Sequence, residues 1–166
     1  MRARVARDRA GGCRGVEAFL LQRARSGVSS LMERRLVVEI EVPRWGFIKR
    51  SPSGQIDYVS PLPSPFNYGC VPGVMGRDGD PLDAVVLGPR LPRGHRLTVA
   101  VQGVIHLRDA GRIDDKLVCK VGVMTVMERR LVEGFFRTYP LTKGLLNRLR
   151  GAGGDTVFQG WAERER

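Results

Sequence analysis

The sequence predicts an α+β fold that is mainly β. Short β-branched and apolar segments recur between turn-forming residues, acidic clusters stand at the ends of two of them, and segments with helical spacing come late in the chain. Many short strands separated by turns are typical of closed or stacked antiparallel sheets. The chain has 166 residues, enough for one domain with a buried core.

Composition places the chain among ordinary globular proteins. Hydrophobic residues make up 42% and charged residues 27%, as in typical soluble domains. No apolar run is long enough to span a bilayer, which argues against a membrane partner. The three cysteines, Cys13, Cys70 and Cys119, are odd in number and have no CxxC spacing. They argue against a disulfide framework or a zinc site and favour a reducing compartment, so we expect a cytoplasmic protein.

The formal net charge of +11 suggests a polyanionic partner. The cations are 24 Arg and only 4 Lys, a bias that G+C-rich coding produces without any binding function. No long basic run is interleaved with aromatic residues. A nucleic-acid partner is therefore disfavoured, and a small polyanionic substrate suits the basic surface equally well.

The N-terminal part differs from the rest. Residues 1–31 are Arg-rich, with Asp8 and Glu17 as the acids before Met32. The segment resembles a transit peptide in its arginines, but it lacks the apolar core of a secretory signal. We expect a dispensable extension at residues 1–31 and a single domain at residues 32–166.

Three strands are predicted in the first part of this domain. Residues 36–42 are β-branched and apolar, and Glu39 and Glu41 share one face because side chains alternate at period two. Residues 47–49 form a second strand. After a Ser-Pro-Ser-Gly turn, residues 55–59 form its hairpin partner.

An acidic loop organises the middle of the chain. Asp78, Asp80 and Asp83 fall within six positions, while Gly79 permits a turn and Pro81 fixes its φ angle. Carboxylates that converge repel one another unless cations lie between them. The natural cation for an acidic, all-oxygen site is Mg²⁺ or Mn²⁺, with Ca²⁺ as a further choice.

Two other interpretations of this loop were weighed. An EF-hand calcium loop fails, because positions five, six and twelve from Asp78 are Leu82, Asp83 and Pro89. A plain polar turn before a strand remains open. Residues 84–87 form an apolar run that predicts a buried strand carrying the loop at its mouth.

The next segments predict two more strands. Residues 97–107 form a long strand, with a bulge near Gly103 because an isolated glycine in a strand often marks one. Residues 117–124 form another. His95 and His106 have no partner at metal-ligand or triad spacing, so we interpret both as surface or structural residues.

The helical part comes last. Residues 126–137 carry apolar positions at helical spacing and predict an amphipathic helix against the sheet. Residues 141–149 predict a second short helix. A glycine-rich break separates it from a final strand at residues 157–161.

Several motifs together resemble one family. Asp-Gly-Asp-Pro-Leu-Asp-Ala at residues 78–84 resembles the signature of the family I soluble inorganic pyrophosphatases. Asp109, Asp114 and Lys116 are similar to that family's Asp-x4-Asp-x-Lys and lie at its separation from the first motif. The resemblance runs from about residue 37 to residue 161. Other matching pieces are Ile-Glu-Val-Pro at 40–43, Phe-Ile-Lys at 47–49, Asn-Tyr-Gly at 67–69 and Gly-Trp at 160–161.

The resemblance implies a fold and an assembly. The family fold is a compact, twisted OB-like β-barrel, here flanked by one or two C-terminal helices. Bacterial members commonly form homohexamers, so a homo-oligomer is implied. The altered loops of this chain leave the hexamer interface open.

The resemblance also implies a reaction, the Mg²⁺-dependent hydrolysis of pyrophosphate to two phosphates, with Mn²⁺ as an alternative metal. Divalent ions held by clustered carboxylates activate a water, and cationic side chains take up the remaining substrate charge. No Ser, Cys or His stands in an activating arrangement, so no covalent intermediate is expected. Asp80 is implied as the general base. The implied metal-binding residues are Asp78, Asp83, Asp109, Asp114 and Glu41, and the implied phosphate-binding residues are Lys49, Lys116, Tyr68 and Tyr139.

Several residues of the family's pattern, mostly phosphate-binding ones, are replaced in this chain. The family's Glu, Arg, Tyr and Lys are replaced by Ser51, Ser60, Ser64 and Pro140. Arg50 and Lys143 are candidates to restore the lost charge. We expect a divergent but active enzyme. The alternatives are a hydrolase of another phosphoanhydride, such as a nucleotide, and a weakly catalytic homologue that binds nucleic acid.

Overall fold

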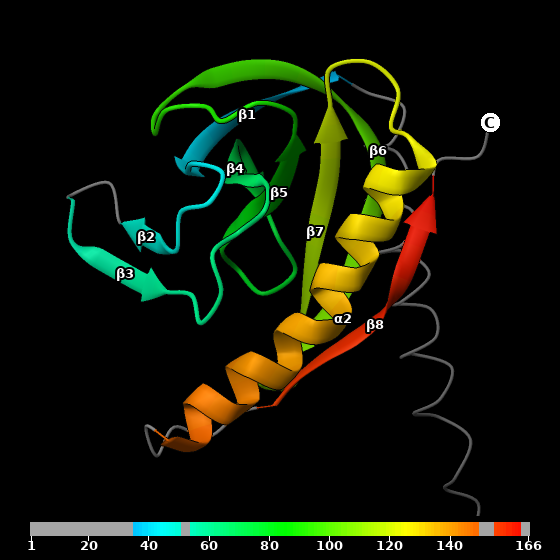
Figure 1. Ribbon diagram of the computed structural model, residues 1–166. Helices are drawn as coiled ribbons and strands as arrows, with labels where there is room; N and C mark the ends of the chain where they lie inside the picture. The colour runs from blue at the N-terminus through cyan, green and yellow to red at the C-terminus, as the bar shows by residue number, and fades with distance from the viewer. Residues whose placement is uncertain (1–34, 51–53, 150–154, 164–166) are drawn as a thin grey trace, which may run out of the picture.

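The computed structural model describes residues 35–50, 54–149 and 155–163, so the predicted extension at residues 1–31 lies outside the described residues. Figure 1 shows the elements in these ranges, which are eight strands and one helix. They are β1 (Arg35–Val42), β2 (Ile48–Arg50), β3 (Ile56–Val59), β4 (Asn67–Met75), β5 (Pro81–Leu87), β6 (Arg96–Asp109), β7 (Arg112–Lys120), α2 (Val126–Leu149) and β8 (Thr156–Glu163).

Five strands close into a ring. Their order is β1-β4-β5-β7-β6, and β6 pairs back with β1. The β5–β7 pair is parallel and the others are antiparallel. The predicted mainly β barrel is therefore confirmed. The hairpin of β2 and β3 forms a separate small sheet that stands beside the ring (Figure 1).

A bulge in β6 lets the two halves of this long strand pair with different strands, β1 and β8, while both pair with β7. The register with β7 shifts between Val101 and Gly103, as the sequence predicts. Before the bulge, residues 96–100 pair with β1 and close the ring. After it, residues 103–109 pair with β8. A Cβ atom at Gly103 would lie 2.4 Å from the Trp161 ring, so this crossing point requires a residue without a side chain.

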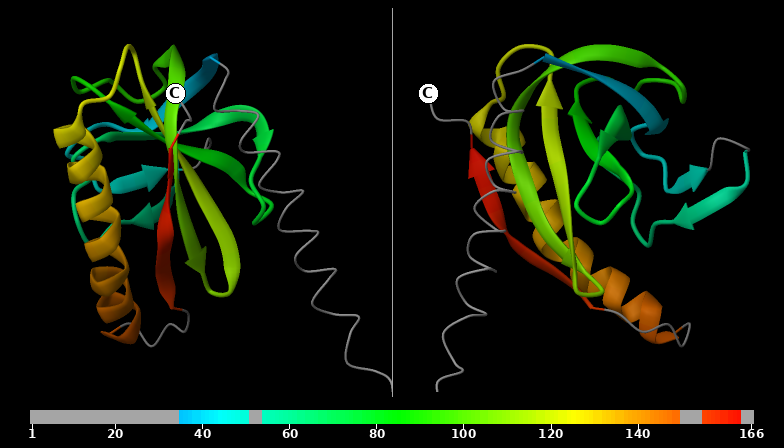
Figure 2. Two further views of the ribbon diagram at one scale, coloured as in Figure 1. Left: turned by 90° about the vertical axis from the view of Figure 1, so that its right-hand side faces the viewer. Right: turned by 180° about the vertical axis from the view of Figure 1, so that it is seen from behind.

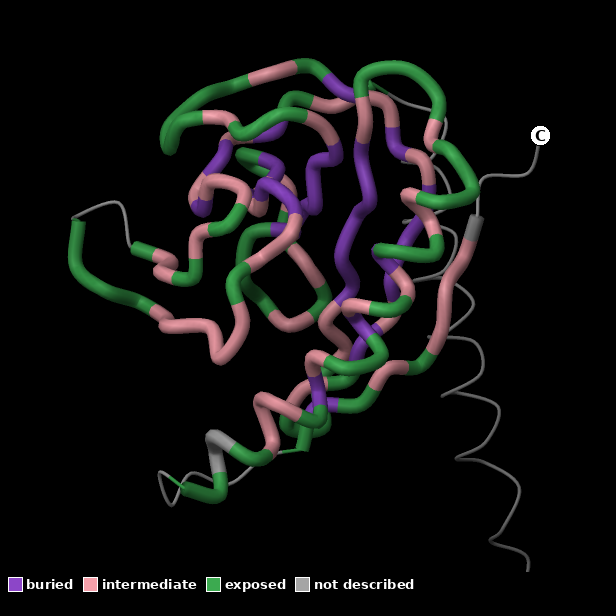
Figure 3. Tube along the Cα trace, viewed as in Figure 1, coloured by how far each residue is buried: buried purple, intermediate pink, exposed green. Residues whose placement is uncertain are grey.

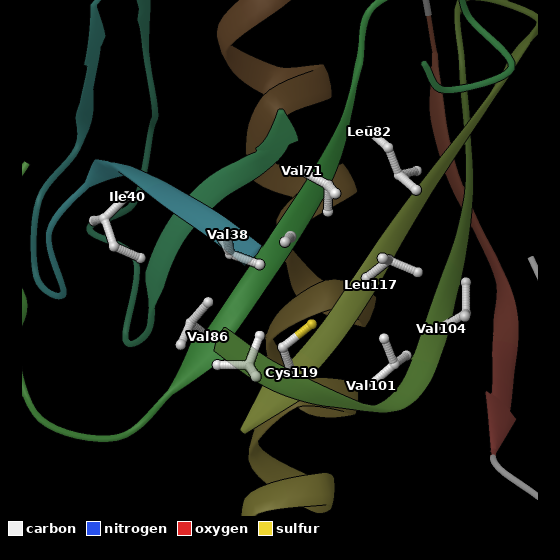
Figure 4. Packing of buried hydrophobic residues seen from close by; sticks show 11 residues of the cluster. Val38, Ile40, Val71, Leu82, Val86, Val101, Val104, Leu117 and Cys119 are labelled. Atoms are coloured by element: carbon white, nitrogen blue, oxygen red, sulfur yellow. The ribbon is translucent and has the colours of Figure 1, made fainter. Parts of the chain in front are cut away.

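The core has two layers because side chains alternate across the ring. One layer fills the interior of the ring, as Figure 4 shows for Leu117 and Cys119 of β7. The other layer lies outside it, where Val118 packs with Val132 and Phe136 of α2. Figure 3 shows the resulting buried run along β7, and Figure 2 shows α2 lying along this face of the sheet.

The helical part is one helix, where the sequence predicts one or two. A capping box begins it: Glu128 N donates to Thr125 Oγ1 at 3.2 Å, and Thr125 N donates to Glu128 Oε2 at 2.8 Å. Pro140 lies inside the helix and is buried. The helix continues past it to Leu149, so the segments predicted as two helices, residues 126–137 and 141–149, form one.

Two predicted strands change their bounds the most. The strand expected at 84–87 already begins at Pro81, so Asp83 lies on β5 and not in the loop. The strand expected at 117–124 runs from Arg112 to Lys120. Among the described residues, no helix is both long and apolar enough to span a membrane.

Candidate active site

A cleft of about 930 Å³ opens between the outer face of β4, β5 and β7, the hairpin of β2 and β3, and α2. All ten site residues implied by the sequence motifs line it. They are Glu41, Lys49, Tyr68, Asp78, Asp80, Asp83, Asp109, Asp114, Lys116 and Tyr139. Residues up to 98 positions apart in sequence thus meet in one hollow, Glu41 and Tyr139 being the outermost.

The acidic loop is a tight turn between β4 and β5. Gly76 N donates to Asp80 O at 2.7 Å, and Asp80 N donates to Asp78 Oδ1 at 3.1 Å. Gly79 has a φ angle of 96°, which a residue with a side chain rarely adopts. The turn leaves Asp80 exposed at the cleft.

Asp83 is the electrostatic centre of the cleft. Its Oδ2 accepts hydrogen bonds from Tyr68 OH and, at 2.7 Å, from Lys116 Nζ. Its Oδ1 lies 3.5 Å from Lys49 Nζ. Burial alone would raise the pKa of Asp83, but the two ammonium groups outweigh it and hold that pKa below the ordinary value. Asp83 is therefore ionised at neutral pH.

Lys116 connects the paired strands β5 and β7 at the cleft. Its ammonium donates to Asp114 Oδ1 at 2.8 Å as well as to Asp83. Burial opposes its charge, yet the two carboxylates raise the pKa of Lys116 above the ordinary value. The pKa of Asp114 is also raised, because burial and the charges of Asp83 and Asp78 together outweigh Lys116.

Tyr68 lies between the two lysines. Lys49 Nζ and Lys116 Nζ stand 5.8 and 5.5 Å from the centre of its ring. Burial, followed by the charges of Asp83 and Asp114, raises the pKa of Tyr68 well above its ordinary value, so its hydroxyl stays a donor. Lys49 Nζ also lies 3.2 Å from Glu41 Oε2.

A second group of contacts lies at the α2 side. Lys143 Nζ donates to Asp109 Oδ2 at 2.7 Å, and Thr156 Oγ1 donates to Asp109 Oδ1 at 2.6 Å. Burial alone would raise the pKa of Asp109, but these two hydrogen bonds and the lysine charges lower it. The hydroxyls of Tyr58 and Tyr139 are 2.8 Å apart and connect β3 to α2.

Tyr58 and Thr156 of this cleft were not singled out from the sequence, and Lys143 was named only as a candidate to restore the lost charge. Only Lys143 carries a local signal, because it lies four residues after Tyr139 and therefore on the same face of a helix. The other two reach the cleft through strand pairing that the sequence does not reveal. Arg50 also lines the cleft, although its Nη1 donates to Gly54 O at 3.1 Å.

The donor set suits Mg²⁺. Among the described residues, no three His, Cys, Asp or Glu side chains already form a group that could hold a metal ion. However, Asp83 and Asp114 converge on one cation, the Lys116 ammonium. Mg²⁺ typically keeps several waters and takes one or two protein carboxylates plus substrate phosphates. The residues present therefore fit an ion that completes its shell with water and substrate.

The chain and its fold are similar to known proteins. A family model described as inorganic pyrophosphatase matches residues 38–143. An inorganic pyrophosphatase of Haemophilus influenzae is 40% identical over 68 residues, which are 39% of this chain and 39% of that protein. One of Helicobacter pylori is 40% identical over 55 residues, 32% of each chain. The alignments thus span well under half the length of these curated relatives.

Solved structures extend the likeness beyond those alignments. The crystal structure of an inorganic pyrophosphatase from Thermus thermophilus has a TM-score of 0.63 and 28% identity, covering 78% of this chain and 83% of that one. One from Neisseria gonorrhoeae has a TM-score of 0.62 and 25% identity, with the same coverage. The fold that carries the cleft is therefore that of solved inorganic pyrophosphatases.

Proposed function

Because the chain belongs to the inorganic pyrophosphatase family, we propose that it hydrolyses inorganic pyrophosphate to two phosphates with Mg²⁺ as its cofactor. The observation that supports this most is the lining of the cleft. Six carboxylates implied by the motifs share one hollow with Lys49, Lys116 and Lys143. A metal ion and a polyanion need just such a mixture, since each requires charges of the opposite sign.

Asp83, Asp114 and Asp78 would hold Mg²⁺ in the centre of the cleft. Asp109 would hold a further ion towards α2, and Glu41 would act through a water. When bound, Mg²⁺ neutralises substrate charge and lowers the pKa of a water. Asp83 is already ionised and directed at a cation in this structure, which supports its role as a ligand.

Asp80 is the residue suited to accept the proton. Its carboxylate is exposed at the cleft and, among the described residues, pairs with no cation. The water oxygen forms a bond to one phosphorus as the bridging P–O bond breaks. Its proton passes to Asp80, and the electron pair of the broken bond leaves with the second phosphate.

The three lysines would bind the phosphate groups. Each now pairs with a carboxylate implied as a metal ligand: Lys116 with Asp83 and Asp114, Lys49 with Asp83, and Lys143 with Asp109. An ion on these carboxylates would release the ammonium groups towards substrate. The hydroxyls of Tyr68 and Tyr139 are further donors, because burial keeps both pKa values above the ordinary range.

Lys143 takes the place of the lysine that the family has at Pro140. It lies one helical turn further on, and its side chain still reaches the cleft. Arg50, the candidate to replace the arginine lost at Ser60, lines the cleft but donates its Nη1 to Gly54 O of its own hairpin. We therefore expect a rate below that of a family member with the full set of cations.

A nucleotide is the second candidate substrate. Small-molecule pockets commonly measure about 300–1,000 Å³, and a cleft of about 930 Å³ has room for more than pyrophosphate. Phe47 lines this cleft and its surface is 50% exposed, so it offers an apolar face to a base. The polar groups of the cleft remain those of a phosphoanhydride site in either case.

Phosphate release distinguishes these substrates. The enzyme would be supplied with pyrophosphate, a nucleoside diphosphate or a nucleoside triphosphate, each titrated with Mg²⁺ and with Mn²⁺. Metal-dependent turnover of pyrophosphate at the highest kcat/KM supports the proposal. A higher kcat/KM for a nucleotide favours the second candidate, and no metal-dependent turnover of any of the three contradicts both.

A further inference from the structure

A charged cluster of Asp115, His106 and Arg77 lies outside the cleft. Asp115 of β7 stands between Asp114 and Lys116, and its side chain is only 2% exposed. Successive side chains of a strand point to opposite faces, so Asp115 points away from the cleft. It continues the inward row of Leu117 and Cys119, which fill the interior of the ring.

His106 of β6 is the first partner of Asp115. The two residues are directly opposite in the antiparallel β6–β7 pair. His106 Nδ1 lies 2.7 Å from Asp115 Oδ1. The structure therefore gives this histidine a carboxylate partner, which its sequence spacing did not reveal.

Arg77 is the second partner, and it comes from the acidic loop. Its Nη1 lies 3.7 Å from Asp115 Oδ2, and its side chain is 27% exposed. That oxygen is buried and has no hydrogen-bond partner among the described residues. A buried carboxylate without full hydrogen bonding is costly, so it attracts the nearby guanidinium strongly.

The Arg77–Asp115 contact lies next to two carboxylates of the cleft. Arg77 directly precedes Asp78, and Asp115 directly follows Asp114. The ion pair thus connects the backbone beside one cleft carboxylate to the backbone beside another. The negative charge of Asp78 acts on Asp114 across the cleft, so the loop and β7 repel each other there. A contact on the opposite face of β7 can hold them together against this repulsion.

We propose that Arg77, Asp115 and His106 form a loop brace, which positions the acidic loop over β7. They are positioning residues, because none of the three lines the cleft. This inference rests on the proposed function for its effect on Mg²⁺, but the brace itself is a property of the metal-free protein. The family motifs described above include none of its three members.

Arg77→Met tests the brace, with Arg77→Lys as the conservative variant. Outer residues that position metal ligands typically change metal affinity by about 10–100-fold. We expect Arg77→Met to raise the Mg²⁺ dissociation constant, measured by calorimetry without substrate, by about tenfold. Arg77→Lys should recover most of this loss, and Asp115→Asn should add little to Arg77→Met because the two share one contact. Arg137→Met, which removes an arginine paired with Glu133 on α2, is the matched control.

Hydrogen exchange of residues 76–80 in the metal-free protein tests the brace independently of the proposed function. Faster exchange in Arg77→Met, recovery in Arg77→Lys and no change in Arg137→Met would support the brace. Unchanged exchange in Arg77→Met would overturn it, whatever the Mg²⁺ result. A wild-type protein that binds no Mg²⁺ would contradict the proposed function, and the exchange data would still decide on the brace.

Discussion

Replacing Lys143 by Met removes an ammonium from the α2 side of the cleft while keeping a side chain of similar length. Lys143 pairs with Asp109 at 2.7 Å, and the two side chains are 17% and 34% exposed. A pair this accessible contributes about 1 kcal/mol or less to stability. We therefore expect the melting temperature to change little.

The expected effect on turnover is much larger. Removing one preorganised group that stabilises developing charge typically costs about 100–1,000-fold in rate. We expect kcat/KM for pyrophosphate to fall by about 100-fold in Lys143→Met, which corresponds to about 2.7 kcal/mol. Lys143→Arg should keep most of the activity. Mg²⁺ binding without substrate should become tighter in Lys143→Met, because the ammonium no longer competes for Asp109.

The expected loss of kcat/KM and the expected gain in Mg²⁺ affinity have opposite signs, so both are measured. Steady-state phosphate release gives kcat/KM, and calorimetry gives Mg²⁺ affinity. Lys120→Met is the matched control, because Lys120 forms a similar 2.8 Å pair with Glu128, with side chains 20% and 29% exposed, and does not line the cleft. A kcat/KM within about threefold of wild type in Lys143→Met would refute the role of Lys143 in replacing the lost cation.

Three further predictions concern stability and reactivity. Asn67 is fully buried, and its amide bonds the backbone of Arg44, Val86, Pro89 and Leu91; Asn67→Leu should cost on the order of 3 kcal/mol in urea unfolding, and a loss under about 1 kcal/mol would contradict this. The folded-state pKa of Asp83 is depressed, so its stabilisation is present above the ordinary value of 3.8 and is lost as pH falls through the lower folded value. Unfolding free energies should therefore fall less steeply below that pH in Asp83→Asn than in wild type, and parallel pH profiles would count against the ion pairs. Burial raises the pKa of the Cys119 thiol to about 12, so an alkylating reagent at pH 8 should not modify it in the folded protein. Rapid alkylation of Cys119, detected by mass spectrometry, would disprove this.

Local patterns were sufficient for much of the fold. The β-branched and apolar residues at 36–42 predicted β1, and the glycine in the middle of residues 97–107 predicted the β6 bulge. β4 was not predicted as a strand, because Asn67–Met75 contains two glycines and a proline, which disfavour strands locally. Pairing with β1 and β5 on either side makes it a strand, and that is a tertiary effect.

Tertiary contacts also decide the length of helix α2, which local sequence patterns did not predict. A proline inside a helix removes a hydrogen bond and usually ends or kinks it, and the segments on either side of Pro140, residues 126–137 and 141–149, were predicted as separate helices. In the structure Pro140 is buried and the helix continues. Packing of Phe136 against the barrel and the pairing of Lys143 with Asp109 hold the segments on both sides of it.

Local sequence patterns predicted one part of the candidate site and not another. Its acidic loop and Asp-x4-Asp-x-Lys motif are short-range patterns, and the structure brings all their carboxylates to one cleft. The loop brace depends on the register that places His106 opposite Asp115, which no local spacing encodes. The roles assigned to the site residues and the homo-oligomeric state stay predictions.

The proposed metal-dependent hydrolysis of pyrophosphate depends on Asp80, which would take the proton from water. The most direct test compares kcat at saturating Mg²⁺ for wild type, Asp80→Asn and Asp57→Asn, since Asp57 is another exposed carboxylate lining the cleft. Loss of general-base catalysis should lower kcat by about 100-fold or more in Asp80→Asn, while Asp57→Asn stays near wild type. Equal rates in Asp80→Asn and wild type would contradict the account.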